Sequence, residues 1–161
     1  MLKYFFLASF LINLNLIAQN STISAKKVFE QCIVLNSKFL LSQEEDDRHI
    51  LEKYTEENLH PVLHGFQDSM CSKFDSCQFE TFTKLLLING NSADELPIST
   101  LGLIFICQTE KMNRFIKNMS KKDKDFIIAL TEIGFLNESM KKPECDYSQQ
   151  KVVLNLLKGL Q

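Results

Sequence analysis

The stretch Met70–Ile88, MCSKFDSCQFETFTKLLLI, decides how the fold is predicted. It places two cysteines, Cys71 and Cys77, directly before an apolar run with helical spacing. Asp75 or Ser76 is suited to cap a helix that continues to about residue 88, because short polar side chains accept hydrogen bonds from the first free backbone N–H groups. If the chain is secreted, disulfides at this point would join the N-terminal helices to the C-terminal ones.

Residues 1–18 predict a secretory signal peptide. Lys3 supplies a positive n-region, Tyr4–Ile17 an apolar h-region, and Ala18 a small residue before cleavage at Gln19. A membrane anchor is the alternative, but spanning a bilayer takes about 20 predominantly apolar residues. This run is shorter and contains two asparagines. We therefore expect a secreted, extracellular protein.

The remainder, residues 19–161, is predicted to be a single all-α domain, a disulfide-stabilised bundle of five or six helices. Its length suits one hydrophobic core, and no linker or repeat divides it. Five glycines and three prolines in 161 residues argue against a turn-rich β fold. With a net charge of −2, the chain does not have the concentration of basic residues that binding to nucleic acid requires. No later run is long enough to span a membrane, so we expect neither nucleic-acid binding nor a membrane span.

Apolar residues spaced three and four apart locate the helices. The predicted helices cover Ser24–Leu41, Asp47–Gln67, residues 76–88, Leu101–Asn118, Lys121–Phe135 and a short segment that starts at Ser148 and ends near Gly159. Within the second helix, Pro61 predicts a kink or a break near His60, because proline removes a backbone hydrogen bond and clashes with the preceding turn.

Several side chains are expected to face the core or to cap these helices. The first helix is expected to bury Val28, Cys32, Leu35 and Phe39, with Phe29, Ile33 and Leu40 beside them. The fifth helix is expected to bury Phe126, Ile127, Leu130 and Ile133. Caps are predicted at Asp46 or Asp47 for the second helix and at Ser120 for the fifth.

All five cysteines follow the predicted signal peptide: Cys32, Cys71, Cys77, Cys107 and Cys145. In an oxidising compartment most should pair, and an odd number leaves a free thiol or a disulfide-linked dimer. Five choices of the odd cysteine and three pairings of the rest leave fifteen schemes open. Because a bridge between distant helices clamps more of the bundle, we expect Cys71 and Cys77 to reach different helices. Zinc is the alternative, but no CxxC pair occurs.

Three N-glycosylation sequons begin at Asn20, Asn118 and Asn137. The last two fall at predicted helix ends, where a surface glycan can be accommodated. They corroborate the prediction of a secreted glycoprotein.

The cysteine order also carries a resemblance. A cysteine on the first helix, then Cys71–x₅–Cys77 before an amphipathic helix, then Cys107 followed by Met112–Phe115, resembles a nematode-expanded family of secreted, helical, cysteine-rich domains of unknown function. The resemblance covers the chain from Cys32 to Cys145. It implies an extracellular location and carries no catalytic residue over to this chain.

Few local motifs suggest chemistry. His60 and His64 have the i,i+4 spacing of metal ligands, with Asp68 one turn on, but Pro61 stands where a zinc protease carries its glutamate base. No nucleophile elbow or glycine-rich phosphate loop occurs. No catalytic residue, cofactor or metal is therefore predicted, and the protein is not expected to be an enzyme.

Two functions remain open. The first is an extracellular binding or interaction protein, whose partner is another protein and whose odd cysteine allows a disulfide-linked dimer. The second is a carrier that holds a small hydrophobic ligand, such as a lipid or fatty acid, in the helical core. Thirteen phenylalanines and five methionines motivate the carrier, although aromatic residues at helical spacing are more often ordinary core.

Overall fold

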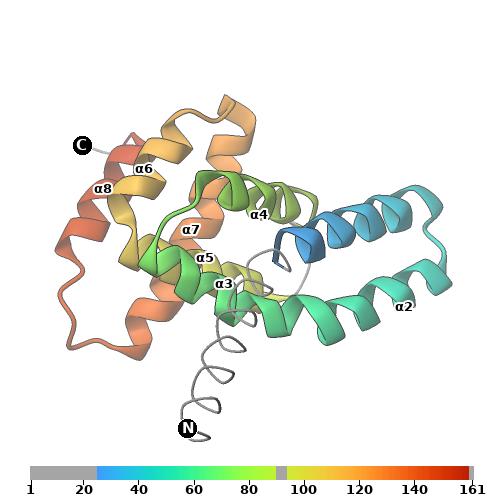
Figure 1. Cartoon of the computed structure of the whole chain (residues 1–161). Coiled ribbons are helices and arrows are strands. Elements are labelled where there is room, and N and C mark those ends of the chain that lie inside the picture. The colour runs from blue at the N-terminus through green and yellow to red at the C-terminus, as the bar shows by residue number, and fades with distance from the viewer. Residues whose placement is uncertain (1–24, 90–93, 160–161) are drawn as a thin grey trace, which may run out of the picture.

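The computed structural model describes residues 25–89 and 94–159, and all regular secondary structure in these ranges is helical (Figure 1). The prediction of an all-α chain is therefore confirmed for this part. The predicted signal peptide and the sequon at Asn20 lie outside the described residues.

The helices follow one another closely along the chain. A first helix covers residues 25–42 and is called the N-terminal helix below. It is followed by α2 (Glu45–Tyr54), the π-helical turn η1 (Thr55–Leu59), α3 (His60–Ser72), α4 (Ser76–Asn89), α5 (Glu95–Cys107), α6 (Thr109–Lys117), α7 (Lys121–Lys141) and α8 (Ser148–Lys158).

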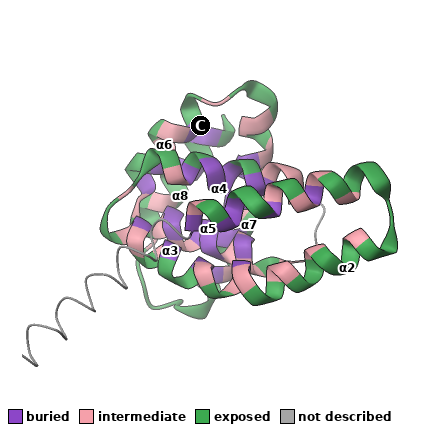
Figure 2. Cartoon of the chain, turned by 45° about the vertical axis from the view of Figure 1, so that its right-hand side comes forward, coloured by how far each residue is buried: buried purple, intermediate pink, exposed green. Residues whose placement is uncertain are grey.

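The N-terminal helix and α2 form an antiparallel pair that projects from the rest of the bundle (Figure 1). Buried residues concentrate in α3, α4, α5 and α7, whereas the outer part of the pair is exposed (Figure 2). Two contacts hold the pair together near its turn. Lys38 Nζ and Ser42 Oγ each donate a hydrogen bond of 2.7 Å to the carboxylate of Asp47. These hydrogen bonds, led by that from Lys38, lower the pKa of Asp47.

Phenylalanine rings from several helices form the centre of the core. Phe82 of α4 is fully buried, and its ring centroid lies 5.4 Å from that of Phe29 and 5.0 Å from that of Phe66. Phe79 continues the cluster toward Phe115 of α6, at a centroid distance of 5.0 Å. Such edge and tilted arrangements are the favoured geometries of aromatic pairs. Much of the phenylalanine content therefore packs against itself.

Helices α5 and α7 cross at two glycines. A Cβ atom on Gly102 would lie 2.2 Å from the carbonyl carbon of Gly134, and a Cβ on Gly134 would lie 2.2 Å from the carbonyl oxygen of Ile98. Glycine is required at both positions, because any larger side chain would prevent the two backbones from approaching this closely. Apolar spacing along the chain does not predict this pair.

Pro61 is accommodated without interrupting the second predicted helix. The chain remains helical from Glu45 to Ser72, and the π turn Thr55–Leu59 lies immediately before the proline, which occupies the first turn of α3. Wide turns of this type are a known response to a disturbed i→i−4 hydrogen-bond ladder. The predicted break near His60 is therefore wrong, and the irregularity that the structure shows is the π turn that precedes the proline.

The predicted fourth helix is wrong in its extent. It begins earlier, at Glu95, and divides at Gln108, whose φ of −131° and ψ of 36° are not helical. The Gln108 side chain donates a hydrogen bond of 2.7 Å to the carbonyl oxygen of Cys71, at the end of α3. A contact over this sequence distance fixes the break, and local apolar spacing does not encode it.

Side-chain placement differs from expectation at the edges of the bundle. In the N-terminal helix Val28, Phe29 and Cys32 are buried, but Leu35 and Phe39 are only half-buried and Leu40 is 54% exposed. The reason is that the outer half of this helix belongs to the projecting pair, away from the main core (Figure 2). Ile133 is 48% exposed rather than buried, because it lies on the face of α7 opposite to the core.

Helix caps agree with the sequence in three places. Asp75 Oδ1 accepts hydrogen bonds from the backbone N–H groups of Cys77 and Gln78, and Ser120 Oγ accepts one from Asp123. Gly159 ends α8 with a φ of 73°. The predicted cap of the second helix is wrong, since α2 has Glu44 at its N-cap, and Asp46 and Asp47 lie in its first turn.

Candidate functional site

A cleft of about 520 Å³ lies between the projecting pair of helices and the adjoining ends of α4 and α5. Its lining residues come from the N-terminal helix, α2, η1, α3, α4 and the N-cap of α5: Asn36, Phe39, Leu40, Arg48, Leu51, Glu52, Thr55, Glu56, His60, Ile88, Asn89 and Asp94. The cleft exists because the pair leaves the bundle at an angle and is held at its base by the buried half of the N-terminal helix.

One wall of the cleft is a continuous helical face. Arg48, Leu51 and Glu52 of α2 are followed by Thr55 and Glu56 of η1, and residues three and four apart lie on the same side of a helix. The π turn belongs to this wall, and π turns occur frequently at functional sites. Along α2 and η1 this wall therefore presents charged side chains, with the apolar Leu51 and the hydroxyl of Thr55 between them.

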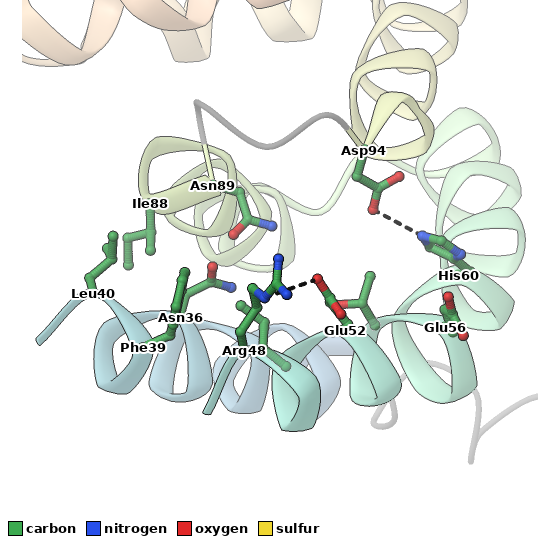
Figure 3. A pocket seen from close by; sticks show the side chains of 12 residues that line it. Asn36, Phe39, Leu40, Arg48, Glu52, Glu56, His60, Ile88, Asn89 and Asp94 are labelled. Atoms are coloured by element: carbon green, nitrogen blue, oxygen red, sulfur yellow. Dashed lines mark hydrogen bonds and ion pairs between the residues drawn. The ribbon is translucent and has the colours of Figure 1, made fainter. Parts of the chain in front are cut away.

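The rest of the lining comes from the N-terminal helix, which is the other member of the projecting pair, and from the ends of α4 and α5. Phe39 and Leu40 contribute apolar surface, and Ile88 faces them from α4 (Figure 3). Asn36 is only 7% exposed, and its Nδ2 donates a hydrogen bond of 2.9 Å to the carbonyl oxygen of Cys32. This amide is a fixed polar group within an otherwise apolar stretch.

The two ends of the cleft differ in polarity (Figure 3). Leu40, Phe39 and Ile88 gather at one end, whereas Glu56 lies with His60 and Asp94 at the other. The asparagine amides and Arg48 lie between these ends. The cleft is thus amphipathic along its length, a property suited to a ligand with one apolar and one polar end.

His60 and Asp94 form the main polar contact across the charged end. The distance from His60 Nε2 to Asp94 Oδ2 is 2.9 Å. Asp94 also caps α5, because its Oδ1 accepts a hydrogen bond of 3.1 Å from the backbone N–H of Leu96. The contact connects the start of α3 to the start of α5 and fixes the imidazole in the cleft wall.

Arg48 is neutralised by carboxylates of its own helix. It forms an ion pair with Glu45, and its Nε lies 3.9 Å from Glu52 Oε1. The hydrogen bond from Arg48 lowers the pKa of Glu45, and the same contact raises the pKa of Arg48. Glu56, one turn beyond Glu52, forms no ion pair within the described part of the chain.

The cysteines form one disulfide among the described residues. Cys71, at the end of α3, is bonded to Cys107, at the end of α5. Cys32, Cys77 and Cys145 are free, so the expectation that most cysteines pair is wrong for the described structure. The expected bridge to another helix is confirmed for Cys71 and wrong for Cys77, which is exposed at the start of α4.

The three free thiols differ in accessibility. Cys32 is fully buried, and burial raises the pKa of its thiol to about 12, with a smaller effect from Asp94. Cys77 and Cys145 are exposed. Only these two thiols are placed to react with partners outside the molecule.

The remaining residues considered from the sequence are dispersed. His60 faces the cleft, whereas His64 and Asp68 are exposed on α3. No group of three or more His, Cys, Asp or Glu side chains in the described ranges could hold a metal ion. Asn118 is exposed at the end of α6, and Asn137 lies inside α7 rather than at a helix end.

The cleft is not predictable from the sequence. The i,i+4 series Arg48, Glu52 and Glu56 was a usable signal for one polar wall, and Asn36 within an apolar stripe was a signal for the other. Neither signal indicates which helix faces them, because Ile88 and Asp94 approach through the tertiary fold.

Comparisons with protein-family models, with curated proteins and with solved structures find no match to this chain. The resemblance to secreted, cysteine-rich domains therefore stays a prediction. Within residues 25–89 and 94–159, none of the helices combines the length and the apolar character that crossing a membrane requires.

Proposed function

We propose that the protein is a secreted, non-enzymatic binding protein and that the cleft beside the projecting pair binds a small amphipathic molecule. The observation that carries the proposal is the division of one cleft into an apolar end at Phe39, Leu40 and Ile88 and a charged end at His60 and Asp94. Its volume of about 520 Å³ falls within the range of about 300–1,000 Å³ typical of small-molecule sites.

The location of the cleft changes the carrier hypothesis in one respect. A ligand held in the helical core would need space among the phenylalanines, but Phe29, Phe66 and Phe82 fill that region with ring-to-ring contacts. The cleft lies at the edge of the core and opens to solvent. A ligand there can enter without separating packed helices.

A binding role is favoured over catalysis by the surroundings of His60. Asp94 orients the imidazole, as an acid does in a catalytic triad, but a triad also needs a nucleophile within hydrogen-bond reach of the base. Neither nitrogen of His60 bonds to a hydroxyl or thiol of the described residues. Thr55 is the hydroxyl that lines the cleft, and it forms no such bond.

Titration with N-phenyl-1-naphthylamine, a neutral fluorescent probe, tests the proposal. We expect saturable binding with a Kd near micromolar. Phe39→Ser should weaken it by about tenfold, because the ligand loses an aromatic wall. Val34→Ser is the matched control, since Val34 is a 58% exposed apolar residue of the same helix outside the cleft. Absence of binding to the folded protein, or equal loss in both variants, would contradict the proposal.

A second candidate function, a covalent interaction with a protein partner, is favoured by the two exposed thiols. Cys77 and Cys145 lie on different parts of the surface, at the start of α4 and in the segment before α8. A second copy of the chain or another extracellular protein with an exposed cysteine would form a reducible link there.

The intact mass of the protein secreted from a eukaryotic host tests both the location and this second function. We expect a chain that begins near Gln19 and a dimer that reduction separates. Cys77→Ser and Cys145→Ser identify the linking thiol, whereas Cys32→Ser is the control because that thiol is buried. A chain that retains residues 1–18 would contradict secretion. If the intact mass without a reductant is that of a single chain, the covalent interaction is contradicted.

A further inference from the structure

We propose that the cleft selects a cationic amphiphile, with the carboxylate of Glu56 receiving an amine or quaternary ammonium group and the apolar end holding a hydrocarbon chain. This inference rests on the proposed function of the cleft and goes beyond it by naming the chemical class of the ligand. It is carried by the charges that line the cleft, by how they are paired and by their position along it.

Acidic groups are in excess among the lining residues. The carboxylates belong to Glu52, Glu56 and Asp94, and the basic groups to Arg48 and His60. Even when His60 is protonated, one carboxylate exceeds the cations. The local charge therefore favours a positive ligand, by an attraction that added salt weakens because Glu52 and Glu56 are exposed.

The pairing of these charges indicates where the cation would bind. The guanidinium of Arg48 contacts Glu45 and Glu52, and the imidazole of His60 contacts Asp94. Three carboxylates line the cleft. Among the described residues, Glu56 is the one of the three that forms no ion pair with a basic side chain. An incoming ammonium group can thus bind Glu56 without breaking an existing ion pair.

The same arrangement disfavours an anionic amphiphile such as a fatty acid. Its carboxylate would meet a guanidinium whose charge is already offset by two acids, Glu45 and Glu52. It would also lie near Glu56 and Asp94, and juxtaposed like charges oppose binding. The charge pattern therefore provides discrimination as well as attraction.

The distribution of apolar groups accounts for the rest of the ligand. Glu56 lies at the same end of the cleft as His60, and the side chains of Phe39, Leu40 and Ile88 lie at the far end (Figure 3). Leu51 continues the apolar surface along the α2 wall. A ligand with its cation at Glu56 would extend its chain past Leu51 toward Phe39, so that both ends meet groups of matching chemistry.

Calorimetric titration with two probes of equal chain length tests the inference. Nonyltrimethylammonium and decanoate both carry a nine-carbon chain on their head group and, each below its micelle concentration, differ mainly in the sign of that head group. We expect the ammonium probe to bind more tightly, by about fivefold or more, and the difference to shrink as salt is added. Equal or tighter binding of decanoate would overturn the inference.

A pair of neighbouring glutamates provides the matched variants. Glu56→Gln should weaken the ammonium probe by about fivefold while leaving decanoate unchanged or slightly improved. Glu57→Gln removes the same charge one residue away, from a side chain that pairs with Lys53 and does not line the cleft. It should leave both probes unchanged. Equal losses in the two variants would overturn the role of Glu56.

The neutral naphthylamine probe distinguishes a failure of the proposed function from a failure of the inferred ligand class. If it binds and responds to Phe39→Ser while the charged probes show no preference for the cation, the cleft is a binding site and the inferred ligand class is wrong. If it fails to bind the folded protein, the proposed function is wrong, and the inferred ligand class is overturned with it.

Discussion

Alanine at Gly134 is expected to destabilise the protein by about 3 kcal/mol or more, the upper part of the range for overpacked helix contacts. The added methyl group would lie 2.2 Å from the carbonyl oxygen of Ile98 and 2.9 Å from the backbone nitrogen of Gly102. Both are backbone atoms of α5, so no side chain can rotate away. The helices must separate along their whole contact, and this cost exceeds the gain in helix propensity.

Urea unfolding followed by circular dichroism measures the effect, and Gly65→Ala is the control. Gly65 lies inside α3, is exposed, and has nothing within 4 Å of an added Cβ. Alanine there should stabilise the protein by up to about 1 kcal/mol, because glycine is a poor helix former. Gly102→Ala should resemble Gly134→Ala. Two substitutions of the same kind therefore have opposite signs, and similar effects at Gly65 and Gly134 would contradict the close crossing.

The sequence was sufficient for features that depend on neighbours along the chain. The cap at Asp75, the cap at Ser120 and the left-handed end at Gly159 each involve groups within four residues of one another. The all-α class was predictable for the same reason, since the spacing of apolar residues within each helix is a local feature of the sequence. Pro61 shows the limit of such local rules, since a kink or a break was predicted there and the chain instead remains helical through a π turn.

Features that join distant segments were not predictable in this way. The break at Gln108 depends on a hydrogen bond to Cys71 O, and the glycine pair depends on how α5 and α7 cross. The cleft needs Asp94 to meet His60 across 34 residues of sequence. Each such feature is decided by the angle at which helices meet, and apolar periodicity does not contain that angle.

Alanine at Phe82 is expected to destabilise the protein by about 4 kcal/mol, within the range for removal of a buried aromatic ring. Phe82 is fully buried, and its ring contacts Phe29, Phe66 and Phe79. These partners come from the N-terminal helix, α3 and α4 itself. Removal of the ring leaves a cavity among three helices, and their rigid positions prevent its collapse.

Two further variants show whether the aromatic cluster or only the volume of Phe82 is required. Phe82→Leu keeps most of the apolar volume and should recover more than half of the loss. Phe126→Ala removes the same ring from a half-buried position in α7 and should cost clearly less than Phe82→Ala.

Because Phe82 touches the base of the N-terminal helix through Phe29, Phe82→Ala should also weaken binding of the naphthylamine probe at temperatures where the variant remains folded. Unchanged probe affinity in that variant would show that the cleft is positioned independently of the core.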